Sequence, residues 1–271
     1  MSAPSSLLFV HAHPDDEALF SAGTTRRYVT HGVSTFLVTC TDGRLGLDHR
    51  VRAGNDPRHN SALTRQVRSQ ELSTSVELLG FERHVTLGYR DSGLSDWRQN
   101  LDPGSFVNAD VEAVARTIAS IIDEVNAAVV VTYDENGYYG HPDHIQCNVV
   151  TQRAVRLSSS AQRLFYPVTP RSVLKEFVPA AQSRGVSLPL WVIDAGDGLA
   201  DEQVTVDIDA TEFASLKQQS IAAHASQVDN ADLVTMDEDL FRLLFGHEYY
   251  QLGWSRQPNM TTAHELFGGL T

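Results

Sequence analysis

Uninterrupted apolar runs that alternate with helix-like segments constrain the fold of this chain most strongly. Residues 7–10 (LLFV) and 127–132 (AAVVVT) are apolar at almost every position. A strand with one face in water would alternate polar and apolar side chains, so a continuous apolar run is expected for a strand covered on both faces. Helical patterns lie between such runs, which favours right-handed βαβ crossovers. The sequence therefore predicts an α/β fold, a Rossmann-like, mostly parallel sheet with helices on both faces.

The rest of the chain indicates one domain with a less regular C-terminal third. Further strands are predicted at residues 33–39, 84–87, 164–168, 190–193 and 204–208, and helices at residues 15–31, 63–79, 109–126, 141–157 and 210–228. Residues 43–63, rich in Gly, Arg, Asp, Asn and His, are predicted to form a long loop, and such loops in compact domains are commonly functional. We expect a single domain over residues 1–271. Its core would span about residues 5–157, and an elaboration at residues 158–271 would contribute to the substrate pocket.

Charge and cysteine content narrow the classes of partner and compartment. The chain has 21 Lys and Arg against 34 Asp and Glu, and this net charge of −13 disfavours binding to nucleic acid or anionic membranes. No apolar run reaches the roughly 18 residues of a membrane span. Residues 1–6 lack the basic and apolar regions of a signal peptide, and Cys40 and Cys147 are the only cysteines. We therefore expect a cytoplasmic protein with no membrane contact and no nucleic-acid partner. Two reduced thiols are expected, with one disulfide between them as the alternative.

Two short motifs echo each other, residues 13–17 (HPDDE) and residues 141–144 (HPDH). Each follows a predicted buried strand and opens a predicted helix, so both are expected at the carboxyl edge of the sheet, where ligands bind. Proline at the first helical position would leave the preceding histidine as the cap. Residues three apart share one helical face, which joins His13 to Asp16 and His141 to His144.

This arrangement assembles a histidine, an aspartate and a histidine around one point. Two imidazoles and one carboxylate with an open fourth position are typical of a catalytic zinc site. Asp15 and His141 remain beside that point, positioned as a base and an acid. Either motif alone could simply be a helix cap with polar surface residues and no metal. The presence of both motifs at matching positions favours a metal site.

The motif pair resembles the LmbE-like, or PIG-L, deacetylases, and among them most closely the mycothiol-pathway deacetylases. The similarity is strongest in residues 7–17 (LLFVHAHPDDE) and 129–144 (VVVTYDENGYYGHPDH). Supporting similarity lies at residues 39–41 (TCT), Arg68 with Glu71, residues 79–80 (LG), residues 89–93 (YRDSG) and residues 222–225 (AAHA). The likeness thus covers roughly the first 150 residues and a late patch near residue 224.

The resemblance implies a role for individual residues. It makes His13, Asp16 and His144 the ligands of one divalent ion, zinc or iron, and Asp15 the general base on the attacking water. His141 becomes the cation that stabilises the oxyanion or protonates the leaving amine, with Asp143 orienting it and Tyr139 near the oxyanion. Arg68 and Asp91 become substrate-binding residues.

Several of these assignments have plain structural alternatives. Asp143 could serve only as an anion at a helix N-terminus, and Tyr139 could be a loop residue that merely packs. Arg68 could form a surface ion pair with Glu71, and Asp91 could simply hold its turn. His224, in a predicted helix, is expected to be a satisfied core histidine rather than a site residue.

The expected function is zinc-dependent hydrolysis of the N-acyl amide, here N-acetyl, of a small amino-sugar conjugate. Phe20 and the arginine-rich loop at residues 43–63 depart from the family pattern, which leaves the substrate open among thiol-pathway, antibiotic and chitooligosaccharide conjugates. Alternatives are an amidase of larger mycothiol-type conjugates and a non-catalytic metal- or carbohydrate-binding module. Metal binding alone would require neither Asp15 nor His141, which argues against the module. A dinucleotide-dependent oxidoreductase is disfavoured because no Gly-x-Gly-x-x-Gly follows the first strand.

Overall fold

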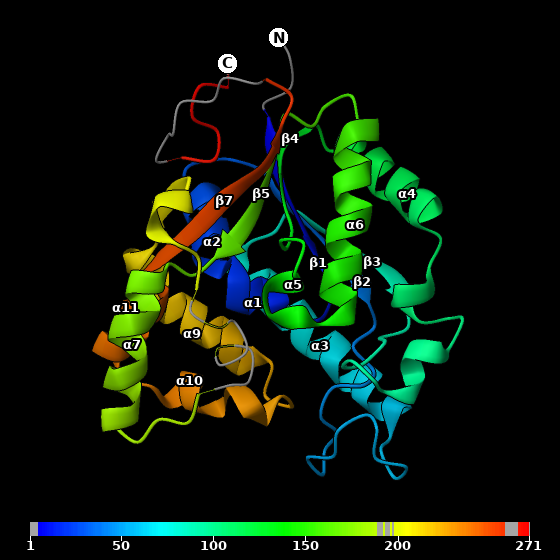
Figure 1. Ribbon diagram of the computed structural model, residues 1–271, viewed down its shortest axis with the longest axis vertical. Helices are drawn as coiled ribbons and strands as arrows, with labels where there is room; N and C mark the ends of the chain where they lie inside the picture. Colours follow the sequence, from blue (N-terminus) through cyan, green and yellow to red (C-terminus); the bar gives the residue numbers. More distant parts are fainter. Residues whose placement is uncertain (1–4, 189–191, 193–195, 197, 258–264, 271) are drawn as a thin grey trace.

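A computed structural model describes residues 5–188, 192, 196, 198–257 and 265–270 of the chain. Its centre is a seven-stranded sheet with the strand order β3-β2-β1-β4-β5-β7-β6 (Figure 1). The strands are β1 (Ser6–His11), β2 (Thr35–Thr41), β3 (Arg83–Tyr89), β4 (Ala127–Val131), β5 (Arg163–Val168), β6 (Val206–Asp209) and β7 (His247–Ser255). β1 to β5 run parallel, β7 pairs antiparallel with β5, and β6 pairs antiparallel with β7.

Helices connect and cover these strands. The α-helices are α1 (Asp16–Phe20), α2 (Ala22–Thr30), α3 (Ser61–Leu79), α4 (Val111–Glu124), α5 (Gly137–Gly140), α6 (Pro142–Leu157), α7 (Arg171–Ser183), α9 (Ala214–Ala223), α10 (Ala231–Thr235) and α11 (Glu238–Phe245). Short 3₁₀ turns are η1 (Arg98–Leu101), η2 (Phe106–Asn108), η3 (Asp201–Gln203), η4 (Thr211–Phe213) and η5 (Val228–Asn230). Among the described helices, none is both long and apolar enough to cross a membrane.

The sheet is covered on both faces, as its apolar strands require. Along β1, Leu8 and Val10 belong to the apolar cluster that includes α4 and α6, whereas Leu7 and Phe9 belong to the cluster that includes α2 and α3. Every residue of β1 and β4 is buried. The prediction of an α/β fold with a mostly parallel, doubly covered sheet is therefore confirmed.

The first motif departs from the predicted helix start. The segment predicted as one helix at residues 15–31 is two helices that meet at Ser21, and α1 begins only at Asp16. Asp15 occupies the N-cap with φ 117°, so Pro14 precedes the helix instead of opening it. The cause is local: the Asp16 carboxylate accepts the His13 N–H at 2.7 Å and the Glu17 carboxylate accepts the Asp15 N–H at 3.0 Å, which replaces ordinary capping.

The second motif follows the prediction. Pro142 is the first residue of α6, His141 is its N-cap, and the His141 side chain accepts the Asp143 N–H. Residues 43–60 contain no helix or strand, as expected for the long loop. The helix predicted at residues 210–228 is shorter, Ala214–Ala223. The strand predicted at residues 190–193 lies outside the described residues except for Val192.

Candidate metal and active site

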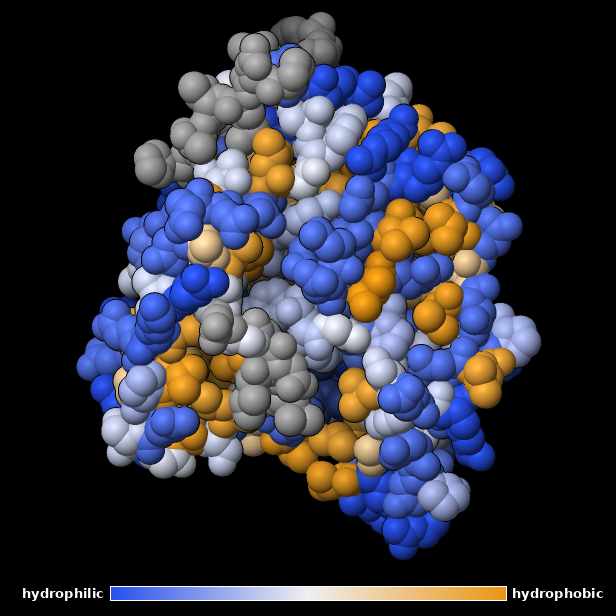
Figure 2. Space-filling model, in the orientation of Figure 1, coloured by the Kyte–Doolittle hydropathy of each residue, from blue (hydrophilic) through white to orange (hydrophobic). Residues whose placement is uncertain are grey.

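The two His-Pro-Asp motifs lie next to each other because β1 and β4 are adjacent in the sheet, with Phe9 paired to Val131. Both motifs follow the carboxyl ends of these strands and face a pocket of about 280 Å³. Its polar lining includes His13, Asp15, Arg68, Asp91, His141 and Asp229, and its apolar lining includes Leu45, Leu47, Leu94 and Trp97. Figure 2 shows a hollow in the lower half of the surface with hydrophobic side chains at its rim.

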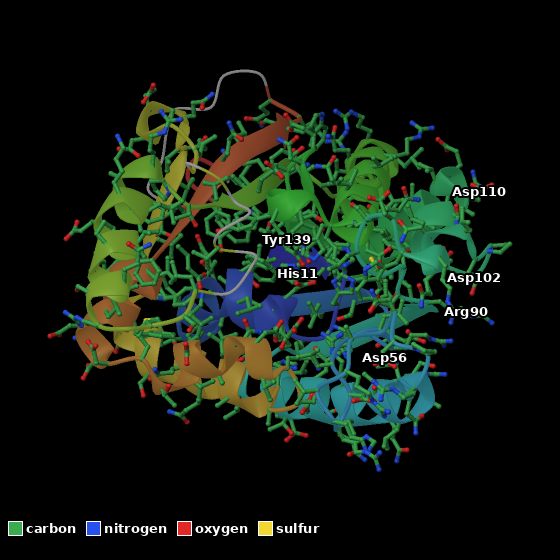
Figure 3. All side chains as sticks on the ribbon, turned by 60° about the horizontal axis from the view of Figure 1, so that its bottom comes forward. His11, Asp56, Arg90, Asp102, Asp110 and Tyr139 are labelled. Atoms are coloured by element: carbon green, nitrogen blue, oxygen red, sulfur yellow. The ribbon has the colours of Figure 1, made fainter. Side chains whose placement is uncertain are left out.

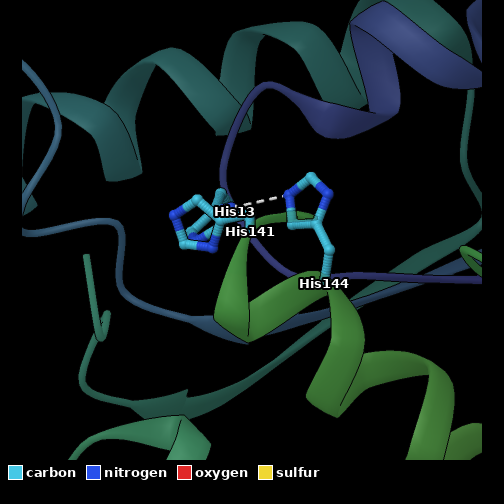
Figure 4. Close-up of side chains that lie close together, drawn as sticks. All are labelled: His13, His141 and His144. Atoms are coloured by element: carbon cyan, nitrogen blue, oxygen red, sulfur yellow. Dashed lines mark hydrogen bonds between the residues drawn. The ribbon is translucent and has the colours of Figure 1, made fainter. Parts of the chain in front are cut away.

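The three predicted ligands lie together, and two of them, His13 and Asp16, line this pocket. His13 Nδ1 lies 3.1 Å from His144 Nε2, the contact drawn in Figure 4. One Asp16 carboxylate oxygen lies 3.5 Å from His13 Nδ1, and the other lies 3.5 Å from His144 Nε2. All three side chains are buried. This brings two imidazole nitrogens and a carboxylate around one small space.

The second nitrogen of each imidazole has its own partner, which aims the first nitrogen at that space. His144 Nδ1 lies 3.2 Å from the Gly137 carbonyl, which can only accept, so Nδ1 carries the proton and the Nε2 lone pair points inward. His13 Nε2 lies 3.2 Å from an Asp143 carboxylate oxygen. Ligand histidines commonly show such an outer carboxylate or carbonyl partner. The residues present therefore fit a divalent ion.

The electrostatics of Asp16 and His144 agree with cation binding, whereas Asp143 and Asp16 outweigh burial and raise the pKa of His13, which has to release its proton when an ion binds. Burial disfavours a charge on Asp16, but the neighbouring His144 and His13 outweigh it and lower the pKa of this carboxyl. Burial lowers the pKa of His144 to about 3, which leaves the ring neutral. The Tyr133 hydroxyl donates to Asp16 at 2.6 Å and accepts the Ala12 N–H at 3.0 Å. The Asp16 carboxylate is thus ionised and held in place.

His141 is close enough to be a rival ligand. Nitrogens of His13, His141 and His144 lie within 4.8 Å of one another, and so do ligand atoms of His13, Asp91, His141 and Asp143. However, His141 Nδ1 accepts the Asp143 N–H at 3.1 Å, which leaves only Nε2 free to face the pocket. Burial, together with His13 and His144, lowers the pKa of His141 to about 3. This arrangement favours a neutral ring whose Nε2 carries the proton and can donate a hydrogen bond.

Asp15 lies beside the predicted ligands and lines the pocket. Its carboxylate is 3.1 Å from Arg68 Nη2. Burial raises the pKa of Asp15 to about 7 although Arg68 opposes the shift. A carboxyl group that titrates near neutrality can both accept and return a proton, which is what a general base in amide hydrolysis must do.

Asp143 contacts His141, as expected, and also Ser92 and His13. Its carboxylate accepts two hydrogen bonds from Ser92, from the backbone N–H at 2.8 Å and from the hydroxyl at 2.5 Å. The same carboxylate hydrogen-bonds to His13, and the backbone N–H of Asp143 donates to His141. Asp143 thus contacts His13 through its side chain and His141 through its main chain.

Tyr139 lies at the pocket in a distorted turn, because α5 contains non-helical backbone angles at Tyr138 (φ 66°) and at Tyr139 itself. The centre of its ring lies 5.0 Å from that of His144 and 6.0 Å from that of His141. Figure 3 shows Tyr139 near the middle of the molecule, whereas Arg90 and Asp102 lie at the outer edge.

Arg68 and Asp91 line the pocket, and both also hold its walls. Arg68 is buried and donates to the Gly43 carbonyl at 2.8 Å and to the Pro14 carbonyl. The expected alternative, a surface ion pair with Glu71, is wrong, because the Glu71 carboxylate instead accepts hydrogen bonds from Ser226.

Asp91 joins its own turn to the long loop. Its carboxylate accepts the Gly93 N–H at 2.8 Å and the Leu45 N–H at 3.2 Å. The expected turn-holding role is therefore present, together with a position on the pocket wall.

Sequence reasoning missed several supporting residues. Tyr133, Ser92 and Glu17 all contact a predicted site residue, and each stands within or directly after a segment that the resemblance singled out. Polar or aromatic residues directly after a buried strand, such as Tyr133 after β4, were the available signal. Phe20, noted as a departure, packs against Tyr138 and Tyr133 and lines the pocket.

Comparison with protein families matches residues 8–155 to the family described as GlcNAc-PI de-N-acetylase, PIG-L. The chain belongs to this family. It is 37% identical to a 1D-myo-inositol 2-acetamido-2-deoxy-alpha-D-glucopyranoside deacetylase of Thermomonospora curvata, over 97% of this chain and 96% of the relative. A deacetylase of the same description from Streptomyces avermitilis is 37% identical, over 97% of both chains. The resemblance inferred from the motifs is thus confirmed.

Solved structures share the fold at lower sequence identity. The N,N'-diacetylchitobiose deacetylase of Pyrococcus horikoshii aligns with a TM-score of 0.62 and 17% identity, over 92% of this chain and 83% of that one. A teicoplanin-pathway deacetylase aligns with a TM-score of 0.60 and 18% identity, over 92% and 97%. The 4-carboxy-2-hydroxymuconate hydratase GalB of a Pseudomonas also aligns, with a TM-score of 0.61, 14% identity and coverage of 95% and 100%. Because a hydratase shares the fold, the reaction has to be argued from the site.

Proposed function

We propose that this protein is a metal-dependent N-deacetylase that hydrolyses the N-acetyl amide of a small amino-sugar conjugate and releases acetate and a free amine. The observation that carries this proposal is the convergence of His13, Asp16 and His144 on one space with Asp15 beside it. The full-length similarity to curated acetamido-sugar deacetylases supports the same reaction.

We further propose zinc as the ion, held by His13, Asp16 and His144, with iron as the alternative. Two imidazoles and one carboxylate are a common ligand set of catalytic zinc sites. When bound, such an ion supplies Lewis acidity, which polarises the amide carbonyl and makes a water molecule more acidic. His141, whose Nδ1 is already engaged by a backbone N–H, serves the substrate rather than the ion.

The protein's own side chains then move the proton and stabilise charge. Asp15 removes a proton from the attacking water as the oxygen–carbon bond forms. His141 Nε2–H and the Tyr139 hydroxyl donate hydrogen bonds to the carbonyl oxygen as it becomes an oxyanion. The carbon–nitrogen bond then breaks, and the departing nitrogen receives the proton held on Asp15. His141 is the alternative proton donor at this last step.

The pocket suits a hydroxyl-rich substrate of modest size. Arg68, Asp91, Gln227 and Asp229 offer charged and polar groups to such a molecule around the pocket of about 280 Å³. We propose a glucosamine conjugate of the kind named for the relatives, an N-acetylglucosaminide of an inositol, and we propose that residues 158–271 complete the pocket of one single domain. We also propose that the enzyme is cytoplasmic and binds neither nucleic acid nor membranes. The net charge of −13 supports the last two points, because it disfavours contact with anionic surfaces.

The test is a panel of N-acylated amino sugars incubated with the zinc-loaded protein, with both free amine and released acid quantified. We expect N-acetylglucosaminyl-inositol to be hydrolysed with a higher kcat/KM than N-acetylglucosamine, with acetate and amine in equal amounts. His13→Ala is the matched control and should release neither. Preferred release of an acyl group larger than acetate would replace the deacetylase with an amidase of larger conjugates.

A further inference from the structure

A buried contact joins the first motif to the C-terminal third of the chain. His224, directly after α9, places Nε2 2.6 Å from Glu17 Oε1 on α1. The same Glu17 oxygen accepts the Ser75 hydroxyl of α3 at 2.5 Å. Glu17 is fully buried and His224 is only 3% exposed. Two residues that are distant in the sequence, one on α3 and one directly after α9, therefore fix this carboxylate of α1.

The other oxygen of Glu17 acts on the main chain of Asp15. Glu17 Oε2 accepts the Asp15 N–H at 3.0 Å. Asp15 has φ 117°, a backbone conformation that a residue with a side chain rarely adopts, and such conformations persist only where surrounding contacts hold them. Arg68 pairs with the carboxylate of Asp15 at the same time. Glu17 thus holds the backbone of Asp15, and Arg68 holds its side chain.

We infer that Glu17 and His224 are positioning residues, which keep Asp15 in the geometry needed to act on the attacking water. Neither of them lines the pocket, so they act through Asp15 rather than on the substrate. The inference rests on the proposed function, since it takes Asp15 as the base. It also gives the C-terminal third a part in the chemistry, because the side chain that fixes Glu17 comes from residue 224.

A purely structural role for this buried pair is the competing explanation, and the chain offers a matched control for it. Lys217 lies on α9, the helix that His224 follows, is 1% exposed, and places Nζ 2.6 Å from Glu248. Glu248 in turn accepts the backbone N–H groups of Gly23 and Thr24, at the start of α2. Lys217→Met therefore breaks a comparable buried pair on α9 without reaching Asp15.

The experiment measures kcat, KM, zinc content and melting temperature for His224→Ala, Glu17→Gln and Lys217→Met. Loss of positioning should lower kcat by about 10–100-fold in His224→Ala, with zinc content unchanged and KM within about threefold. Glu17→Gln keeps an oxygen that can accept the Asp15 N–H, so it should lower kcat less. Lys217→Met should lower the melting temperature but leave kcat per bound zinc unchanged.

The same variants are repeated in an Asp15→Asn background. If His224 acts through Asp15, His224→Ala should then change the residual kcat by less than about twofold. An equal loss of kcat in both backgrounds, or wild-type kcat in folded His224→Ala and Glu17→Gln, would overturn the inference. Should His224→Ala not fold, Glu17→Gln alone decides. Wild-type turnover of Asp15→Asn itself would instead overturn Asp15 as the base and with it the proposed mechanism.

Discussion

The two His-Pro-Asp turns begin with the same three residues, follow adjacent strands and nevertheless differ in their backbone. At the second turn, His141 caps α6 and Pro142 opens it in the ordinary way. At the first, the side chains of Asp16 and Glu17 take the backbone N–H groups of His13 and Asp15, and Asp15 is held at φ 117°. The comparison teaches that the conventional turn supplies the scaffold and the proposed oxyanion donor, whereas the distorted turn supplies the proposed base.

The largest expected effect comes from removing one of the two proposed ligands of the first motif. His13→Ala should lose both metal and activity, because the two remaining ligands, Asp16 and His144, bind zinc weakly. Zinc at 100 times its Kd should stabilise the wild-type protein by about 2.7 kcal/mol, and this gain should vanish in the variant. Zinc content by mass spectrometry and melting curves with and without zinc check both statements. An unchanged zinc content in His13→Ala would place the ion elsewhere.

Asp15→Asn should come next in magnitude. The variant keeps the shape of the side chain and the charges of the ligands, so zinc content should stay near one per chain. Without a carboxylate to take the proton, kcat should fall by about 10²–10⁴-fold. Single-turnover kinetics with N-acetylglucosaminyl-inositol provide the measurement, and wild-type rates would contradict the assignment of the base.

His141→Ala sharpens the comparison by testing whether the second turn holds the ion through one histidine or two. We expect zinc content to remain, because His13, Asp16 and His144 are intact, while kcat falls by about 10²–10³-fold through loss of an oxyanion donor. His144→Ala is the paired control and should lose the ion. Zinc loss in His141→Ala would make this residue a ligand and support the alternative histidine grouping.

The smallest expected effect concerns the backbone itself. Replacing Asp15 by Gly or by Ala removes the same carboxylate, but glycine tolerates φ 117°, so Asp15→Gly should be more stable than Asp15→Ala by roughly 1–2 kcal/mol. Asp143 is the matching residue of the second turn and lies within α6. Glycine is unfavourable in a helix, so the order should reverse there, with Asp143→Gly less stable than Asp143→Ala by roughly 0.5–1 kcal/mol. Urea denaturation of the four variants measures both differences. The same order at both positions would mean that the two turns do not differ in strain.

The sequence predicted the parallel half of the sheet well because that information is local. Continuous apolar runs mark β1 and β4, Gly80 marks the end of α3 with φ 80°, and Pro142 marks the start of α6. The C-terminal elements were harder. β7 mixes polar and apolar residues without clear alternation, and α7 contains Pro179, which sequence reasoning treats as a helix breaker.

The residues of the candidate site could be predicted from the sequence, but the hydrogen bonds that hold them in place could not. The spacing of the motifs indicated that His13, Asp16 and His144 would meet, and the structure places them together. The backbone of Asp15 and the contact between Asp143 and His13 depend on Glu17 and Ser92, whose own partners are brought in by folding. Contacts between residues 17 and 224 leave no local pattern in the sequence.

The order of the strands has a consequence for cutting or grafting this protein. The family match ends at residue 155, yet β5, which pairs with β4, begins at Arg163. A fragment that stopped at the family boundary would expose the N–H and C=O groups along the free edge of β4, whose five residues are all buried in the whole chain. Such an apolar edge is a template for pairing with other chains. The fragment would therefore tend to aggregate. A transplantable unit has to include β7 and also residues 265–270, because Leu266 is buried in the core and its carbonyl accepts a hydrogen bond from Arg163 of β5.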